Sequence, residues 1–376
     1  MPSLSDVFSP GGLLASRIPG YRLRPQQLEM AERIEAAIAA NKVLVAEAGT
    51  GTGKTFAYLV PALLSGGKVI VSTGTKNLQD QLFSKDIPTV CQALGAPVQV
   101  ALLKGRANYV CPYHLERALS EGRFFSKEDA ADVHRVARFA KKTKTGDKSE
   151  CADVAENSGV WSMVTSTREN CLGSSCPRFR ECHVHRARRE ALAADIVVIN
   201  HHLFFADVAV RESGMAELLP TVRVVVFDEA HQINETGVQF LGTQISTGQW
   251  MDFARDLLIA GLQHARGLAD WAGLSQLLEL SARDLRLVVG NAIFQGANGV
   301  AAGARVRWTE EAPEGLSDAA WHAALRALGS ACAQSLEALD TVSEISPDLE
   351  RLYERGSALL ARLARFSGPC QADAVR

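Results

Sequence analysis

The sequence predicts an α/β fold built around a parallel β-sheet, interrupted by one inserted region and followed by a mainly helical region. Short apolar runs rich in Val and Ile alternate with helix-like segments over residues 26–103, which is the pattern of β–α–β units. The alternation stops over residues 107–190, where the chain is polar and basic and carries cysteines, and it resumes at residue 195. From about residue 235 the sequence is rich in Ala and Leu at helical spacing.

Each element of the predicted sheet domain follows from its local pattern. A helix is expected over residues 26–40, because Leu28, Ala31 and Ile34 recur on one face. The strands of a parallel sheet are covered on both faces and therefore consist of continuous apolar runs. Such runs occupy residues 42–46, 68–73, 98–103, 195–200 and 222–227, and helices are expected over 54–64 and from residue 77. The stretch 291–305 is expected to be a loop or hairpin linker.

Composition and charge limit the class of protein. The chain has 376 residues, 47% of them apolar, and a formal net charge of −2, so two or three domains with a sizeable core are expected. The net charge alone indicates neither a nucleic-acid nor a membrane partner. The charges are segregated, because residues 135–148 carry six basic residues, 178–189 carry five, and 310–350 carry nine acidic ones. Each of these runs can also be a solvated helix face.

Targeting features indicate a cytoplasmic location. No apolar run approaches the ~18 residues that a membrane-spanning helix needs. The first residues, MPSLSDVFSPGG, lack the basic segment that opens a secretory signal. We therefore expect a cytoplasmic protein without a membrane partner. Its eight cysteines are then expected to serve metal or redox chemistry before disulfides.

Residues 46–55, AEAGTGTGKT, place a glycine-rich loop between an expected strand and an expected helix. Glycines let successive backbone N–H groups converge on an anion, and the helix N-terminus adds its positive end. In such loops the lysine, here Lys54, reaches the β- and γ-phosphates of a nucleotide, and the hydroxyl, here Thr55, binds Mg²⁺. The usual pattern is G-x-x-x-x-G-K-[ST], and its first position is Ala here. The alternative is a glycine-rich turn with a chance Lys-Thr pair. The predicted loop residues that bind nucleotide are Ala48, Gly49, Thr50, Gly51, Thr52, Gly53, Lys54 and Thr55.

The second half of a nucleotide site should be an acid at the end of another strand. The run VRVVVFDEAH ends a strand with Asp228 and Glu229, at the sheet edge where ligands bind in such folds. Asp228 can hold Mg²⁺ through water, and Glu229 can accept a proton from the attacking water. His231 lies beside this centre and can couple it to another event. A polar strand end is the alternative interpretation, which the presence of the phosphate loop disfavours.

The inserted region gathers cysteines. Cys171, Cys176 and Cys182 lie within twelve residues, and Cys111 lies near the start of the region. Four thiolates from one region fit a tetrahedral or cuboidal metal centre. Spacing alone leaves an iron–sulfur cluster and a zinc site equally open, with Cys151 as a fifth candidate ligand. Four unrelated reduced thiols are the remaining alternative.

Two further expectations concern this region and the other cysteines. Because the region is polar and short of apolar residues, we expect that it cannot fold on core burial alone and that metal ligation contributes much of its stability. The cysteines outside the region are expected to be ordinary small apolar residues, and these are Cys91, Cys332 and Cys370.

Taken together, the motifs resemble one family. They are RPQQLEM, EAGTGTGKT, VSTGTKNLQDQL, KGRANYVC, the three late cysteines, INHHLFF and DEAH, in that order. This set is similar to that of the DinG/YoaA-type helicases, bacterial superfamily 2 relatives of XPD that carry an iron–sulfur cluster. The resemblance covers the whole chain and is most specific over residues 20–232.

The resemblance implies roles that spacing could not assign. It implies a [4Fe–4S] cluster and leaves Cys151 outside the ligand set, which is Cys111, Cys171, Cys176 and Cys182. It implies that Gln27 contacts adenine, with ATP as substrate and Mg²⁺ as cofactor. It implies that residues near the DNA backbone are Ser72, Thr73 and Lys76, and the basic run that contains Arg178 and Arg180 becomes a candidate for phosphate contact. It further implies 5′→3′ movement on single-stranded or forked DNA, in repair or replication, and a protein partner in the replication machinery.

The resemblance also implies a domain plan. Residues 1–106 and 191–234 correspond to a RecA-like ATP-binding domain, 107–190 to an iron–sulfur domain, and 235–376 to part of a helical Arch domain. The SAT-like and QxxGRxxR motifs of the family's second motor domain do not occur in the sequence, so we expect an N-terminal portion of a longer protein with negligible activity by itself. The alternatives are a non-catalytic module that binds DNA or a partner, and a zinc-containing RNA-directed ATPase.

Overall fold

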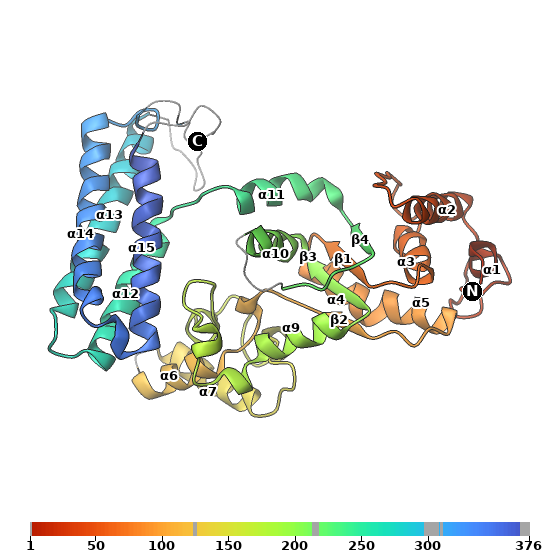
Figure 1. Cartoon of the computed structure of the whole chain (residues 1–376), viewed down its shortest axis with the longest axis horizontal. Coiled ribbons are helices and arrows are strands. Elements are labelled where there is room, and N and C mark those ends of the chain that lie inside the picture. Colours follow the sequence, from red (N-terminus) through yellow and green to blue (C-terminus); the bar gives the residue numbers. More distant parts are fainter. Residues whose placement is uncertain (1, 123–125, 213–217, 297–307, 309–310, 369–376) are drawn as a thin grey trace. The chain divides into compact units, whose positions relative to one another are not determined.

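The computed structural model describes residues 2–122, 126–212, 218–296, 308 and 311–368. Within these residues the chain forms two compact units (Figure 1). The first comprises Met1–Ser166 with Arg180–Gly242, and the second comprises Thr167–Phe179 with Thr243–Arg376. The segment Thr167–Phe179 therefore lies inside the inserted region of the sequence but packs with the C-terminal helices.

The first unit contains a parallel sheet of four strands in the order β2-β3-β1-β4. The strands are β1 (Val69–Thr73), β2 (Val100–Leu102), β3 (Ile196–Asn200) and β4 (Val224–Phe227). In register, Val69 of β1 faces Ile196 of β3 on one side and Val224 of β4 on the other. The predicted parallel α/β sheet is confirmed, because four of the five apolar runs pair as expected.

Helices cover both faces of this sheet. Val69 and Val71 of β1 belong to one hydrophobic cluster and Ile70 to another, because successive side chains of a strand point to opposite faces. The helices of the sheet domain are α1 (Leu4–Phe8), α2 (Pro25–Ala39), α3 (Lys54–Leu64), α4 (Lys76–Gln81), α5 (Ile87–Leu94), α9 (His183–Ala193), α10 (His201–Glu212) and α11 (Ile233–Leu241). The first cluster includes residues of α1 to α3 and α5, and the second includes residues of α9 and α10. The helices predicted over 26–40 and 54–64 are confirmed as α2 and α3.

The apolar run 42–46 was expected to be a buried strand, and this prediction is wrong for the structure described. The run is outside the sheet, and the side chains of Val43 and Val45 are 94% and 92% exposed. β-branched residues favour an extended backbone, but a strand exists only where a neighbour supplies its hydrogen bonds. In this structure β4 pairs with β1, and the run does not extend the sheet beyond β4.

The inserted region has a hydrophobic cluster of its own, and the expectation that it does not fold on core burial alone stays a prediction. Its helices are α6 (Pro112–Glu121), α7 (Lys127–Ala140) and α8 (Val160–Val164). Burial is nearly complete for Val133, Val136 and Val160, and Trp161 closes the cluster with its indole N–H donating to the Ala155 carbonyl at 2.8 Å. The apolar positions were missed because they are spread at helical spacing among charged residues.

The second unit is a bundle of long helices, drawn from cyan to blue in Figure 1. Its helices are α12 (Thr247–His264), α13 (Trp271–Gly296), α14 (Asp318–Asp340) and α15 (Pro347–Ser367). Trp250, Phe253 and Trp271 are buried at its centre. Residues 291–296, which were expected to be a linker, belong to α13, and residues 297–305 lie outside the described part of the chain. No helix of the described residues is long and apolar enough to cross a membrane.

Candidate functional site

The glycine-rich loop leads directly into α3. Gly53 is the N-cap of this helix and has a left-handed backbone, with φ of 83°, as does Gly51. A side chain at Gly53 would also collide with Gln27, because a Cβ there would lie 2.2 Å from the Gln27 amide nitrogen. Position 53 therefore requires glycine for two reasons, the left-handed backbone and the close approach of the Gln27 side chain. Lys54 and Thr55, the first residues of α3, remain partly exposed.

Gln27 connects α2 to the glycine-rich loop. Its side chain is 3% exposed, and its Nε2 donates a hydrogen bond to the Gly53 carbonyl at 2.8 Å. A buried amide with a defined partner holds its position well. Gln27 was expected to contact adenine, and in the structure its side chain lies against the loop that is expected to bind phosphate.

The acidic pair follows β4 at the carboxyl edge of the sheet. The Asp228 N–H donates to the Ser72 carbonyl at 2.8 Å, which extends the β1–β4 ladder by one bond. Glu229 has a left-handed backbone, with φ of 56°, a conformation that is costly for a residue with a side chain. His231 is exposed, and its Nδ1 lies 3.4 Å from Oε2 of Glu229.

Tyr58 of α3 joins the acidic pair to the helix that follows the loop. Its hydroxyl donates to Oδ2 of Asp228 at 3.4 Å, and its side chain is 4% exposed. Burial, followed by the negative charge of Asp228, raises the pKa of Tyr58 well above its ordinary value. Burial and then the neighbouring Glu229 carboxylate raise the pKa of Asp228, and Lys54 partly opposes this shift. The charge of Lys54, at the end of the loop, and the charges of the acidic pair therefore influence one another.

Sequence reasoning missed Tyr58 and His201. His201 begins α10 and is 1% exposed, and its Nδ1 hydrogen-bonds the Ser72 hydroxyl at 2.7 Å. Burial lowers the pKa of His201, and the nearby backbone of Asp228 and Glu229 partly opposes this effect. The available signal was position: His201 directly follows β3, so it lies at the same carboxyl edge of the sheet as the acidic pair.

The residues predicted to lie near DNA have different environments. Ser72 and Thr73 are fully buried, so neither side chain is accessible to DNA in this conformation. Lys76 is exposed and forms an ion pair with Glu156 of the inserted region at 3.3 Å. Arg178 is partly exposed in the segment that packs with the helical unit, and Arg180 is exposed in the sheet unit.

The four candidate cysteine ligands are all partly exposed. Cys111 and Cys182 are the N-cap residues of α6 and α9 in the first unit, and Cys171 and Cys176 belong to the segment that packs with the second unit. Among the residues that the structure describes, no three or more His, Cys, Asp or Glu side chains are close enough to hold a metal ion.

Cys151 differs from these four. It is 5% exposed and packs in the hydrophobic cluster of the inserted region. Burial, followed by the negative charge of Asp153, raises the pKa of its thiol. Because the thiolate is the form that binds metals, this environment favours a structural role.

Lys104, in the KGRANYVC stretch, joins the sheet domain to the inserted region. Its side chain is 4% exposed, and its Nζ lies 2.9 Å from Asp80 of α4 and 2.8 Å from Asp147 of the insertion. Burial lowers the pKa of Lys104, but the hydrogen bonds and charges of Asp147 and Asp80 outweigh it, so the pKa is raised overall. Its backbone N–H donates a hydrogen bond to the Tyr109 hydroxyl oxygen at 3.0 Å.

Comparison with known proteins gives two matching families and several relatives. The DEAD/DEAH box helicase model matches residues 24–108, and the DEAD_2 model matches residues 131–250. The ATP-dependent DNA helicase YoaA of Haemophilus influenzae is 40% identical over 371 residues, which is 97% of this chain. The chain belongs to the DinG/YoaA family of DEAD/DEAH-box helicases.

Other members of this family match shorter parts of the chain. The YoaA protein of Escherichia coli is 46% identical over 78% of the chain, and the ATP-dependent helicase DinG of Mycobacterium tuberculosis is 36% identical over 59%. The chain spans about half the length of the two YoaA proteins, 55% and 46% respectively.

Proposed function

We propose that the chain binds Mg·ATP at the carboxyl edge of its sheet and supplies the ATP-binding part of a DNA helicase that acts on single-stranded or forked DNA in the cytoplasm. The observation that carries the proposal is the contact between Tyr58 of α3 and Asp228 after β4. It links the helix that follows the glycine-rich loop to the acidic pair within one compact unit, which supports the proposal. The relatives named as ATP-dependent DNA helicases support DNA as the partner.

In the proposed reaction each residue has a separate task. The loop backbone and the Lys54 ammonium hold the phosphates, and Gln27 keeps the loop in place through Gly53. Thr55 and Asp228 offer the hydroxyl and carboxylate oxygens that Mg²⁺ prefers. Glu229 accepts a proton from the water that attacks the γ-phosphorus, and ADP is the leaving group. His231, at 3.4 Å, orients the Glu229 carboxylate.

We further propose that Cys111, Cys171, Cys176 and Cys182 hold a [4Fe–4S] cluster. The donor set fits chemically, because all four are partly exposed thiols. Two of them, Cys111 and Cys182, are the N-cap residues of α6 and α9. The burial of Cys151 in an apolar cluster supports its exclusion. A bound cluster would contribute its binding free energy to the folded state.

Calorimetric titration with Mg·ATP tests the nucleotide site. Lys54→Ala removes a charge-assisted contact, which predicts affinity weaker by about 10- to 100-fold or more. Glu229→Gln should keep nucleotide binding, because it preserves shape and removes only the proton acceptor. Lys42→Ala is the matched control, since Lys42 is an exposed lysine just before the loop. Unchanged affinity in Lys54→Ala would contradict the phosphate-loop assignment.

A further inference from the structure

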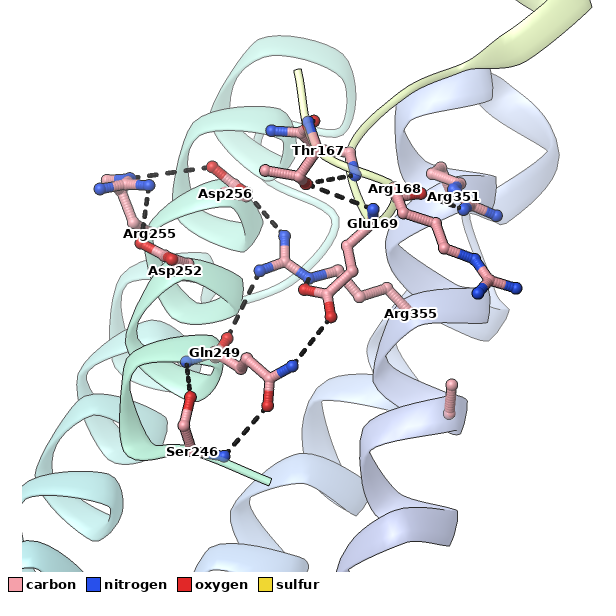
Figure 2. A network of polar contacts seen from close by, with 12 residues as sticks. Thr167, Arg168, Glu169, Ser246, Gln249, Asp252, Arg255, Asp256, Arg351 and Arg355 are labelled. Atoms are coloured by element: carbon pink, nitrogen blue, oxygen red, sulfur yellow. Dashed lines mark hydrogen bonds and ion pairs between the residues drawn. The ribbon is translucent and has the colours of Figure 1, made fainter. Parts of the chain in front are cut away.

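The segment Thr167–Phe179 carries Cys171 and Cys176, yet it belongs to the compact unit of the helical bundle. More than sixty residues separate it in sequence from α12, which begins at Thr247. Polar contacts from α12 and α15 reach the segment at Glu169 and at its neighbour Arg168 (Figure 2).

Arg355 of α15 is the centre of these contacts. Its side chain is 5% exposed, and its Nη1 lies 2.7 Å from Oδ2 of Asp256 on α12. Its Nη2 donates to the Gln249 carbonyl at 3.4 Å, and its Nε faces Oε2 of Glu169 at 3.5 Å. A buried guanidinium needs partners for its charge on each side. In Figure 2 α12 and the segment supply them from two directions.

Glu169 is held by more than Arg355. The Gln249 side chain donates from Nε2 to Oε1 of Glu169 at 3.0 Å. The oxygen of the same amide accepts the Ser246 N–H at 3.0 Å in the capping box of α12. Gln249 is therefore fixed at both ends of its amide. Arg362 adds a weaker contact to Oε1 of Glu169 at 3.8 Å.

The backbone next to Glu169 is fixed as well. Arg351 of α15 donates from Nη2 to the Arg168 carbonyl at 2.8 Å. The Thr167 hydroxyl accepts the N–H groups of Glu169 and Asn170 at 3.2 and 3.3 Å. These bonds close a turn that ends immediately before Cys171. Anchoring Glu169 therefore also limits where the next residues of the segment can lie.

We propose that Glu169, clamped by Arg355 and Gln249, is the positioning residue that fixes the cysteine-bearing segment on α12 and α15 and so holds Cys171 and Cys176 in place for the metal centre. The metal part of this inference rests on the proposed function. The anchor itself rests only on the contacts within the helical unit. A displacement of α15 would carry the two cysteines with it.

Hydrogen exchange of the 376-residue chain, followed by mass spectrometry, tests the anchor without reference to metal. Glu169→Ala removes the hydrogen bond from Gln249 and the ion pair with Arg355, which predicts about 10- to 100-fold faster exchange in residues 167–179. Glu279→Ala is the matched control, because the ion pair of Glu279 is with Arg283 of its own helix, α13. Arg355→Lys keeps the charge but loses the planar fork, so it should also accelerate exchange in residues 167–179. Unchanged exchange in Glu169→Ala would overturn the anchor.

Iron and sulfide content after anaerobic purification tests the consequence for the metal centre. We expect lower content in Glu169→Ala than in the parent chain, and unchanged content in Glu279→Ala. Faster exchange with full iron content would overturn the positioning role. A parent chain without iron would overturn the proposed cluster, whereas the exchange measurement would still decide whether Glu169 is an anchor.

Discussion

Replacement of Cys151 by serine separates the structural role of a cysteine in the inserted region from a ligand role. The thiol is 5% exposed among Val110, Leu115 and other apolar side chains. A serine hydroxyl in that cluster has to lose water, at a cost of about 1–3 kcal/mol when it is not well paired. With a denaturant slope of about 2 kcal/mol per molar urea, this loss lowers the unfolding midpoint of the inserted region by about 0.5–1.5 M.

The assay combines urea unfolding with iron and sulfide analysis of the anaerobically purified chain. Cys151→Ser should be destabilised and keep its iron. Cys151→Ala is the matched control, because it removes the sulfur without adding a polar group, and it should cost less than serine although serine is closer in shape. Cys176→Ser should lose iron, because Cys176 is a partly exposed proposed ligand.

The reasoning would be refuted if both Cys151 variants lost as much iron as Cys176→Ser while their circular dichroism spectra matched that of the parent chain. That result would make Cys151 a ligand. Equal stability of Cys151→Ser and the parent chain would instead show that the hydroxyl finds a partner in the cluster, and that the apolar surroundings of Cys151 do not determine its role.

Two further predictions concern buried charges in the first unit. Lys104→Met leaves the largely buried Asp147 without its cation, and breaking such a pair costs about 3–5 kcal/mol. Urea unfolding should therefore show a lower midpoint for Lys104→Met than for the control Lys85→Met, which replaces an exposed lysine. Equal midpoints of the two variants would contradict the buried ion pair. Burial raises the pKa of Asp86, an effect that Gln81 and Lys85 partly oppose. Because the folded pKa lies above the unfolded one, the protonated form favours folding, and this contribution is lost as pH rises through the folded pKa. The free energy of unfolding of Asp86→Asn, relative to that of the parent chain, should therefore increase between pH 4 and pH 7. Urea unfolding at both pH values measures this difference, and a smaller difference at pH 7 than at pH 4 would refute the raised pKa of Asp86.

Sequence reasoning predicted the strands that became β1 to β4, because a strand covered on both faces must be apolar throughout its length. It failed at residues 42–46, where the same pattern is present but Val43 and Val45 are exposed. Local composition specifies the preference for an extended backbone. Whether an extended segment becomes a strand depends on a neighbour that lies elsewhere in the chain.

In the candidate site, too, some residues were recognisable from local sequence and others only from the folded structure. Glycine spacing, Lys54 and the D-E pair are recognisable in sequence, because phosphate and Mg²⁺ require particular groups at short separations. Tyr58, His201 and Lys104 escaped recognition, because each acts through a partner more than forty residues away in sequence.

The sequence by itself determined the parallel α/β architecture and the glycine-rich loop, since the strand, helix and loop patterns each depend on residues close together in the chain. Only the tertiary structure decided that Cys151 is buried in an apolar core and that the segment 167–179 packs with the distant helices α12 and α15. The physical reason is that burial and ion pairing depend on surfaces brought together by folding. The local sequence around a cysteine or a glutamate does not indicate whether an apolar cluster or an arginine will be its neighbour in the folded protein.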